Sequence, residues 1–263
     1  MIVTLQGGHA NQLFQMAFGL SVAKVRKEDV FFTRNRVDAD VKRSYSLDAY
    51  QVGLNFVKEE TKNKFYDGGN FNLDVYTAPK DTTFIGYWQT EKFIDTDLIR
   101  DLTLRQMPSE ASLRVSDEIR AVDNSVFIHV RRGDYVKEKH TSEFHGNLGI
   151  DYYGSAIGLI RESMSPNFFI FSDDPNWCRT AFPEFRVVDH NRLGNGHAPG
   201  DEHEDLWLMS LCRHAIIANS AFSWWGAWMG DQRRGRMVIA PKQWFRDPSA
   251  QSADIVPDRW IKI

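Results

Sequence analysis

The feature that most constrains the fold is a repeated alternation of short apolar runs with helical segments in the second half of the chain. Val126–Val130 is a β-branched and aromatic run typical of a buried strand, and Phe168–Phe171 is another. The expected strands are 126–130, 168–171, 185–188 and 215–218, and the expected helices are about 151–163, 175–182 and 204–214. Strands that alternate with helices indicate an α/β fold with a parallel sheet.

The beginning of the chain repeats this pattern once. Ile2–Leu5 is a short predicted strand, and a loop that contains glycine follows over residues 6–12. One face of the next predicted helix is defined by Leu13, Met16, Ala17 and Leu20, which recur at helical spacing. Residues 24–125 are charged and rich in turns, and Phe84–Trp88 is one more predicted strand there.

The size and charge of the chain limit its organisation and its ligands. A chain of 263 residues with 42% hydrophobic residues can form two small domains, since domains usually run to roughly 100–200 residues. We expect an N-terminal α/β domain over residues 1–120 and a C-terminal α/β domain over residues 121–263, with a loosely defined boundary. The net charge of −3 argues against a protein whose whole surface binds nucleic acid or anionic lipid, so any basic site must be local.

Cysteine usage and hydropathy indicate the compartment. The two cysteines, Cys178 and Cys212, lie in apolar or helical surroundings, and we interpret them as reduced packing residues rather than a disulfide or metal ligands. No apolar run reaches the roughly 18 residues of a membrane span, and the sequence begins with a predicted strand instead of a leader. We expect a protein of the reducing cytoplasm with at most peripheral membrane contact.

Polar clusters follow four of the predicted strands. In open α/β sheets, ligands bind beyond the carboxyl ends of the strands, where loops and helix N-termini present N–H groups. The clusters are QGGHANQ at 6–12, HVRRGD at 129–134, FSDDP at 171–175 and ANSAFSWWGAW at 218–228. One binding site can collect all four, so we expect the ligand there.

The side chains of these clusters indicate an anionic ligand. Arg131 and Arg132 offer planar guanidinium groups suited to paired phosphate oxygens. The hydroxyl groups of Ser220 and Ser223 offer a second anion-binding edge, which together with the arginines suggests a diphosphate. Neither the phosphate-binding pattern Gly-x-x-x-x-Gly-Lys-Ser/Thr nor the dinucleotide pattern Gly-x-Gly-x-x-Gly occurs, so ATPases and dehydrogenases are disfavoured.

Two adjacent carboxylates indicate the base of the nucleotide. Asp173 and Asp174 cannot bind phosphate, but a carboxylate can accept hydrogen bonds from N1–H and N2–H of guanine, an edge that adenine lacks. The sequence therefore favours a guanine nucleotide.

Each cluster also has a purely structural interpretation. The arginines can pair with acids such as Asp134, and Asp173-Asp174-Pro175 can cap a helix. QGGHANQ can be a tight turn, and the two serines can be helix caps without a ligand. The residues that a structural interpretation assigns to the core are His129, Trp224, Trp225 and Trp228.

Taken together, these segments resemble the bacterial α-1,2-fucosyltransferases in order and spacing. The resemblance covers nearly the whole chain and is carried by GGHANQLFQMAFGLSVAK, GYWQTEKF, HVRRGDYV, FSDDP and DLWLMSLCRHAIIANSAFSWWGAWM. It implies a GT-B type fold, with two Rossmann-like domains facing each other across a donor cleft and the acceptor side in the N-terminal domain. It also implies GDP-β-L-fucose as donor, a terminal galactose as acceptor, inversion at the anomeric carbon, and a place in polysaccharide or O-antigen biosynthesis.

The resemblance also assigns roles to residues of this chain. It places Arg131 and Arg132 on the diphosphate as catalytic residues and His129 near the guanine or ribose. The other donor-binding residues that it implies are Asp173 or Asp174 at guanine, Ser220 and Ser223 beside the phosphates, and Asn11 with the backbone of Gly7 and Gly8.

Two segments depart from the family pattern. His9-Ala10 stands where the family more often has Leu-Gly, and alanine restricts any positive φ in that loop. Ala221 replaces the second serine of the usual Asn-Ser-Ser, which removes one phosphate contact.

Charge determines the expected mechanism. Arginines at the leaving diphosphate can replace a divalent metal, so we expect neither metal nor cofactor. The Asp-x-Asp matches at 38–40 and 95–97 are expected by chance among 35 acidic residues. The residues that are candidates for the acceptor site or the general base are His9, Trp88, Glu91 and Asp134.

One alternative function belongs to another class. A carbohydrate-binding protein without transfer activity would stack its aromatic side chains on sugar faces, and Trp88 would serve either function. A protein that binds only neutral glycans would not need the arginine pair, and so we favour the transferase. Its expected partners are GDP-fucose and a galactose-terminated oligosaccharide or lipid-linked glycan, and not nucleic acid.

Overall fold

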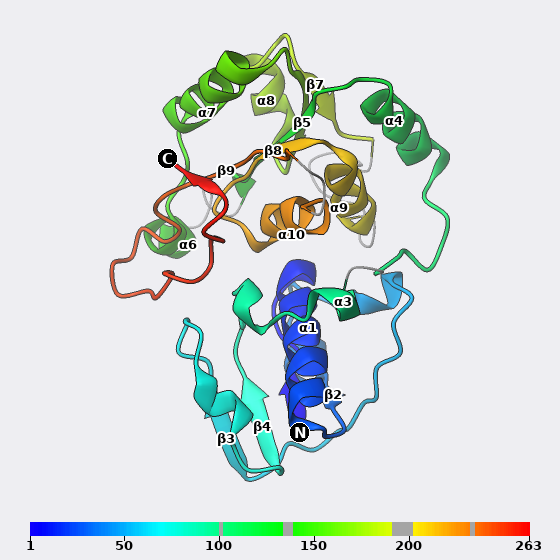
Figure 1. The fold of residues 1–263 in the computed structure, drawn as a ribbon, viewed down its shortest axis with the longest axis vertical. Coiled ribbons are helices and arrows are strands. Elements are labelled where there is room, and N and C mark those ends of the chain that lie inside the picture. Colours follow the sequence, from blue (N-terminus) through cyan, green and yellow to red (C-terminus); the bar gives the residue numbers. More distant parts are fainter. Residues whose placement is uncertain (100–101, 134–138, 191–201, 232–234) are drawn as a thin grey trace. The chain divides into compact units, whose positions relative to one another are not determined.

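The computed structural model describes residues 1–99, 102–133, 139–190, 202–231 and 235–263. The chain forms two compact units (Figure 1). The first unit consists of Met1–Met107 and Gln251–Pro257, and the second consists of Pro108–Ala250 and Asp258–Ile263. Each unit has its own parallel sheet with helices packed on it, as the alternation of strands and helices predicts.

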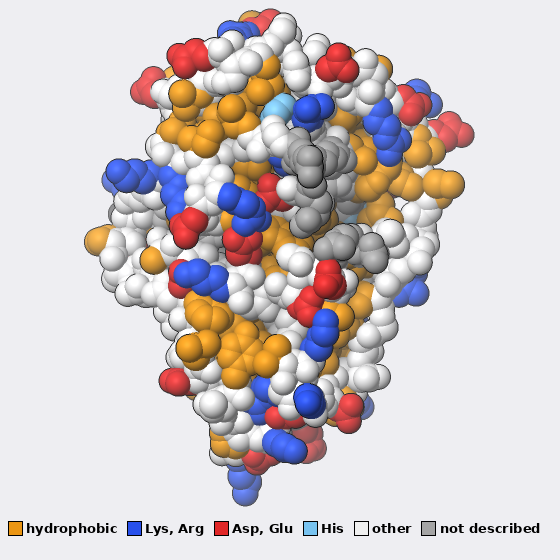
Figure 2. Space-filling model, in the orientation of Figure 1, with side chains coloured by type: hydrophobic (Ala, Val, Ile, Leu, Met, Phe, Trp, Pro, Cys, Tyr) orange, Lys and Arg blue, Asp and Glu red, His pale blue; other side chains and the backbone are white. Residues whose placement is uncertain are grey.

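The surface carries charges of both signs. On the face drawn in Figure 2, Lys and Arg side chains are interspersed with Asp and Glu side chains, and apolar side chains lie between them. This distribution agrees with the net charge of −3. A basic binding site on this protein is therefore a local feature.

The sheet of the first unit has four parallel strands in the order β2-β1-β4-β3. Val3 in β1 lies between Phe32 of β2 and Phe84 of β4 in the register, and all three are fully buried. The strands are β1 (Ile2–Thr4), β2 (Phe31–Thr33), β3 (Asn63–Tyr66) and β4 (Thr82–Ile85). The strand predicted at 84–88 is β4, which begins at Thr82 and ends at Ile85, where the backbone turns.

Helix α1 (His9–Arg26) packs closely on this sheet at Gly19. A Cβ atom at Gly19 would lie 2.9 Å from the Phe32 ring and 3.0 Å from Cγ2 of Val3, so only glycine allows this approach. The helix begins at His9, and the predicted loop 6–12 is correspondingly shorter. The short helical segments of this unit are α2 (Asn35–Asp38), η1 (Leu47–Ala49), η2 (Leu73–Tyr76), η3 (Glu91–Phe93) and α3 (Thr96–Ile99).

The sheet of the second unit has six parallel strands in the order β10-β9-β8-β5-β6-β7. All four strands predicted here are present, and two strands that the sequence pattern did not reveal extend the sheet. The strands are β5 (Ser125–Val130), β6 (Asn167–Ser172), β7 (Arg186–Val188), β8 (His214–Ile216), β9 (Val238–Ala240) and β10 (Ile261–Lys262).

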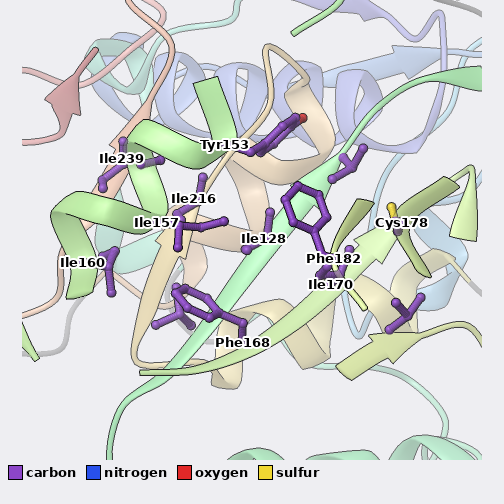
Figure 3. Close-up of a cluster of buried hydrophobic side chains, with 14 residues drawn as sticks. Ile128, Tyr153, Ile157, Ile160, Phe168, Ile170, Cys178, Phe182, Ile216 and Ile239 are labelled. Carbon is purple, nitrogen blue, oxygen red and sulfur yellow. The ribbon is translucent and has the colours of Figure 1, made fainter. Parts of the chain in front are cut away.

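Apolar helices cover both faces of this second sheet. On one face, Tyr153, Ile157 and Ile160 of α7 lie against strand residues such as Ile128 and Ile170 (Figure 3). On the other face, α10 contributes tryptophans that confirm the core interpretation, since Trp224 and Trp225 are fully buried and Trp228 is nearly so. The helices are α4 (Glu110–Arg120), α6 (Lys139–His145), α7 (Ile150–Ser163), α8 (Pro175–Ala181), α9 (Glu202–Leu211) and α10 (Ala221–Met229).

The division between the units differs from the expected boundary at residue 120. Helix α4 belongs to the second unit, because Ser109 and Ser112 donate hydrogen bonds to the carboxylate of Glu204 in α9 at 2.8 and 2.5 Å. Near the other end of the chain, residues 251–257 return to the first unit. There Asp254 accepts a hydrogen bond from the Phe71 backbone and pairs with Lys92.

Candidate functional site

The second sheet has a topological switch point between β5 and β8. The chain continues from β5 to β6 and β7 on one side, whereas β8, β9 and β10 lie on the other side. In open parallel sheets the loops diverge at such a point, and ligands bind beyond the carboxyl ends of the strands. The loop after β5 carries Arg131 and Arg132, and the loop after β8 carries Asn219 and Ser220, so two predicted clusters flank the switch point.

The third cluster follows β6, and its Asp173 fixes residues 131–133, called here the arginine loop. One oxygen of this carboxylate lies 3.1 Å from Nη1 of Arg131, and the other accepts a hydrogen bond of 2.8 Å from the Arg132 backbone. A Cβ atom at Gly133 would lie 2.7 Å from the same carboxylate. Burial by itself raises the pKa of Asp173, but the Arg131 guanidinium and the N–H groups of Arg132 and Gly133 outweigh it and lower that pKa. Asp173 is therefore an ionised clamp on the loop.

Asp174 combines a helix cap with a contact to the second arginine. Its Oδ1 atom accepts a hydrogen bond from the backbone N–H of Trp177, which makes it the N-cap of α8, as the structural interpretation of this cluster predicted. Its Oδ2 atom accepts from Nε of Arg132 at 3.1 Å. The Arg132 guanidinium also lies over the Trp177 ring, 4.2 Å from its centroid.

Contacts within the protein therefore orient both arginines. Their side chains remain 22% and 18% exposed, so both can be reached from solvent. Two arginines and two aspartates together carry no net charge, so an anion would bind through directed N–H groups rather than through an uncompensated positive field. The contact of Asp173 or Asp174 with guanine stays a prediction, since both carboxylates already serve the arginine loop.

The loop after β8 places its two serines differently. Ser220 is the N-cap of α10 and accepts a hydrogen bond from the Phe222 backbone at 3.3 Å. Ser223 is fully buried, and its hydroxyl donates to the backbone oxygens of Ala218 and Ser220. The prediction that Ser223 flanks the phosphates is therefore wrong for this structure, because its hydroxyl lies inside the helix packing.

Asn219 is a positioning residue that was not among the predicted site residues. Its Nδ2 atom donates to the backbone oxygens of His145 and Trp244, at 2.8 and 3.1 Å. These hydrogen bonds tie the loop after β8 to two other segments of the unit. An asparagine directly after an apolar strand run is the sequence signal that could have identified this role.

His129 lies in β5 with only 4% of its surface exposed, and its ring is 5.6 Å from that of Phe222. It is close enough to Asp173 to lower the pKa of that carboxyl group. The burial matches the core interpretation, and the contact with guanine or ribose stays a prediction. Asp134, a candidate base, lies outside the residues that the structure describes.

The first unit has an equivalent switch point between β1 and β4. Gly7 follows β1 with a φ of +74°, and Gly8 is the N-cap residue of α1 with a φ of −75°. Ala10 lies inside the helix, so the replacement of the family glycine requires no positive φ there. Asn11 is partly exposed, and its Oδ1 atom accepts a hydrogen bond of 2.8 Å from Gln89.

Two buried glutamines hold the loops at this switch point, and neither was among the predicted site residues. Gln12 donates to the backbone oxygens of Gly7 and Ser44, at 3.0 and 2.8 Å. Gln15 donates to the backbone oxygen of Gly86 after β4 and accepts from the Gln6 backbone after β1. Both are fully buried. Their place beside apolar residues such as Leu13 and Met16 in a predicted helix is the sequence signal that could have revealed them.

Of the candidate acceptor residues of this unit, His9 and Trp88 are buried, whereas Glu91 is partly exposed. His9 is 3% exposed, and its Nε2 atom lies 2.9 Å from the hydroxyl of Tyr50. Trp88 is 2% exposed and stacks on Phe18 with ring centroids 4.0 Å apart, so its predicted contact with a sugar is wrong and it belongs to the core. Glu91 is partly buried at the start of η3 and stays a candidate base.

Other features bear on cofactors and compartment. Over the described ranges, the structure holds no group of three or more His, Cys, Asp or Glu residues placed to bind a metal ion. Cys178 and Cys212 are buried and free, as predicted, and burial raises the pKa of the Cys178 thiol to about 11. Among the helices described, none is long and apolar enough to cross a membrane.

Comparison with known proteins agrees with this geometry. The sequence model of glycosyl transferase family 11 matches residues 54–263. An α-1,2-colitosyltransferase of Escherichia coli is 30% identical over 100% of this chain and 98% of its own length. The galactoside 2-α-L-fucosyltransferase Sec1 of Mus musculus is also 30% identical, over 68% of this chain but only 51% of its own length.

A solved structure identifies the fold. The α-1,6-fucosyltransferase NodZ of Bradyrhizobium, in crystals soaked with GDP-fucose, superposes with a TM-score of 0.52 at 13% sequence identity. The match covers 87% of this chain and 91% of NodZ. The predicted α/β fold of the GT-B type is thereby confirmed.

Proposed function

This chain belongs to glycosyl transferase family 11, and on that premise we propose that it transfers L-fucose from GDP-β-L-fucose to the 2-hydroxyl group of a terminal galactose. The observation that carries the proposal is the pair of arginines at the switch point of the second sheet, which Asp173 and Asp174 orient. The names of the mouse relative and of NodZ support fucose as the transferred sugar. The name of the mouse relative also supports an α-linkage to the 2-hydroxyl group of a galactoside.

Colitose is the second candidate for the transferred sugar. The E. coli relative that spans the whole chain is named for colitose in the same 1,2 linkage. Colitose is fucose without its 3-hydroxyl group, so the two GDP-sugars present the same diphosphate and guanine. The arginine loop would serve either donor equally, and only direct competition between the donors distinguishes them.

The proposed mechanism follows from charge. The 2-hydroxyl oxygen of galactose attacks the anomeric carbon from the face opposite GDP, and the bond from that carbon to the β-phosphate oxygen breaks with inversion. Negative charge grows on the leaving diphosphate while positive charge grows on the sugar ring. Arg131 and Arg132, fixed by their carboxylates, stabilise this separation more in the transition state than in the ground state.

We propose that the reaction uses neither a metal nor another cofactor, because the directed N–H groups of the arginines can stabilise the negative charge of the leaving group. The hydroxyl proton leaves to a general base or to water. Glu91 is the better exposed of the described candidates, since the imidazole of His9 is buried against Tyr50. The buried free cysteines suit a reducing cytoplasm, where the acceptor is a galactose-terminated oligosaccharide or a lipid-linked glycan.

Product analysis tests this proposal. We expect the purified chain to convert lactose with GDP-fucose, or with GDP-colitose, into an α-1,2-linked product whose linkage NMR identifies. Activity should survive EDTA with at most a few-fold loss, whereas full loss and rescue by magnesium or manganese would contradict the role given to the arginines.

A thermal shift separates the transferase from a glycan-binding protein. GDP at a hundredfold excess over its dissociation constant should stabilise the chain by about 2.7 kcal/mol. If GDP leaves the melting temperature unchanged and galactosides alone raise it, the chain is a glycan-binding protein and the proposal fails.

A further inference from the structure

We propose that Tyr87 is the aromatic platform on which the acceptor galactose stacks, an inference that rests on the proposed function. The side chain is 46% exposed, although it follows a strand whose residues Thr82–Ile85 are all buried. It belongs to the first loop residues after β4, at the switch point of the first sheet. Ligands of parallel sheets bind at that position.

The neighbours of Tyr87 are suited to a sugar. Its ring lies over Gly7, where a Cβ atom would be 3.3 Å from Cε1 of Tyr87 and 2.7 Å from Nδ2 of Asn11. The ring and the amide group of Asn11 therefore lie next to each other above a backbone without a side chain. Gln89 orients Asn11, because it donates a hydrogen bond to Oδ1 and thereby directs the Nδ2 donors away from itself.

The backbone that presents Tyr87 is strained and clamped. Trp88 has a φ of +56°, which is rare for a bulky residue and persists only where the surroundings impose it. A single oxygen of Asp67 accepts hydrogen bonds from the N–H groups of Tyr87 and Trp88, at 3.1 and 2.7 Å. The indole of Trp88 is buried against Phe18, so the turn places one aromatic ring in the core and leaves its neighbour exposed.

This arrangement matches the chemistry of a terminal galactose. The axial 4-hydroxyl group of galactose lies on one face of the ring, and the C–H bonds at positions 3, 4 and 5 form an apolar patch on the other face. An aromatic ring has a negative face that attracts such C–H groups, and an amide beside it can donate to a hydroxyl group. Tyr87 supplies the ring and Asn11 the amide, so this proposal assigns Asn11 to the acceptor and not to the donor, where the resemblance placed it.

The test measures galactoside binding and sugar transfer separately. Binding of lactose without donor is followed by saturation-transfer NMR and titration, for the wild type and for Tyr87→Ala, Tyr87→Phe and Tyr66→Ala. Tyr66 is the matched control, because it is 65% exposed on β3 of the same sheet. Circular dichroism melting shows whether each variant is folded.

We expect Tyr87→Ala to raise the dissociation constant for lactose about tenfold, while Tyr87→Phe, which keeps the ring, and Tyr66→Ala stay within about twofold of the wild type. In transfer assays, the KM for lactose should rise in parallel and the KM for the GDP-sugar should not change. Lactose binding that is absent in the wild type, or unchanged in Tyr87→Ala, overturns the inference. A wild type that binds lactose through Tyr87 but transfers no sugar overturns the proposed function alone.

Discussion

Among single residues, the two arginines show how the protein orients a charged side chain just after a buried strand. Arg131 and Arg132 follow a buried strand, and each is paired with an aspartate that directly follows the neighbouring strand β6. The pairing restricts the side chains before a ligand arrives, which reduces the entropy lost on binding. The same pairing means that part of each arginine's function is structural.

The substitution Arg131→Lys separates the two functions. Lysine keeps the charge and can still pair with Asp173, but it replaces a planar group by a point donor. We expect kcat/KM for the GDP-sugar to fall about thirtyfold to thousandfold, which corresponds to about 2–4 kcal/mol, with little change in melting temperature.

Arg179→Lys is the control for this experiment. Arg179 lies in α8 and also pairs with an aspartate, Asp189, but at the surface. This substitution should leave both activity and stability unchanged. If Arg131→Lys transfers the sugar nearly normally, or loses activity only as it unfolds, the arginine serves the fold and not the diphosphate.

Between helices and sheets, close approach decides which glycines are essential. Gly19 in α1 faces the ring of Phe32, whereas at Gly158 in α7 no neighbouring atom lies within 4 Å of the point that a Cβ atom would occupy. Both positions are helical, so alanine gains the same helix propensity at each. The difference in packing should therefore make alanine destabilising at Gly19 and stabilising at Gly158.

We expect Gly19→Ala to lower the free energy of unfolding by about 1–2 kcal/mol, because overpacking outweighs the propensity gain. Gly158→Ala should raise it by about 0.5–1 kcal/mol. Urea denaturation of both variants measures the difference. Equal effects of the two substitutions would show that α1 adjusts its distance from the sheet without cost.

In the molecule as a whole, the two units repeat one arrangement, a parallel sheet with its polar loops at a switch point. The second unit contains a buried histidine, His214, that bears on its stability in acid. Its Nδ1 atom accepts a hydrogen bond from the Met237 backbone. Burial, with a smaller effect of Arg213 and Arg236, lowers the pKa of His214 to about 4.

A histidine whose pKa is lower in the folded state binds its proton more tightly after unfolding. Its stabilising contribution is complete above the unfolded pKa of about 6.5 and is lost as the pH falls towards 4. We expect the melting temperature to fall over this range, and His214→Asn, whose Oδ1 atom can accept the Met237 N–H, to show a flatter profile. The prediction fails if wild type and variant have the same pH dependence between 6.5 and 4.

The fold class and the positions of the polar loops were predictable from the amino-acid sequence alone. Strand runs such as Val126–Val130 are apolar because both faces of a parallel sheet are covered, so their hydrophobicity is visible in one dimension. The polar clusters are also local, since each directly follows its own strand. Strands β2 and β3 escaped prediction because they are only three or four residues long within charged sequence.

The contacts of each polar side chain, by contrast, depend on the tertiary structure. Asp173 and Asp174 looked alike in sequence, yet one clamps the backbone of the arginine loop and the other caps α8, because the loop that they meet lies 41 and 42 residues earlier in the chain. Trp88 differs from prediction for a related reason. Its predicted place in a strand gave no sign that the backbone turns there with a positive φ and that the indole packs on Phe18. Long-range contacts and backbone strain of this kind leave no periodic signal in a single sequence.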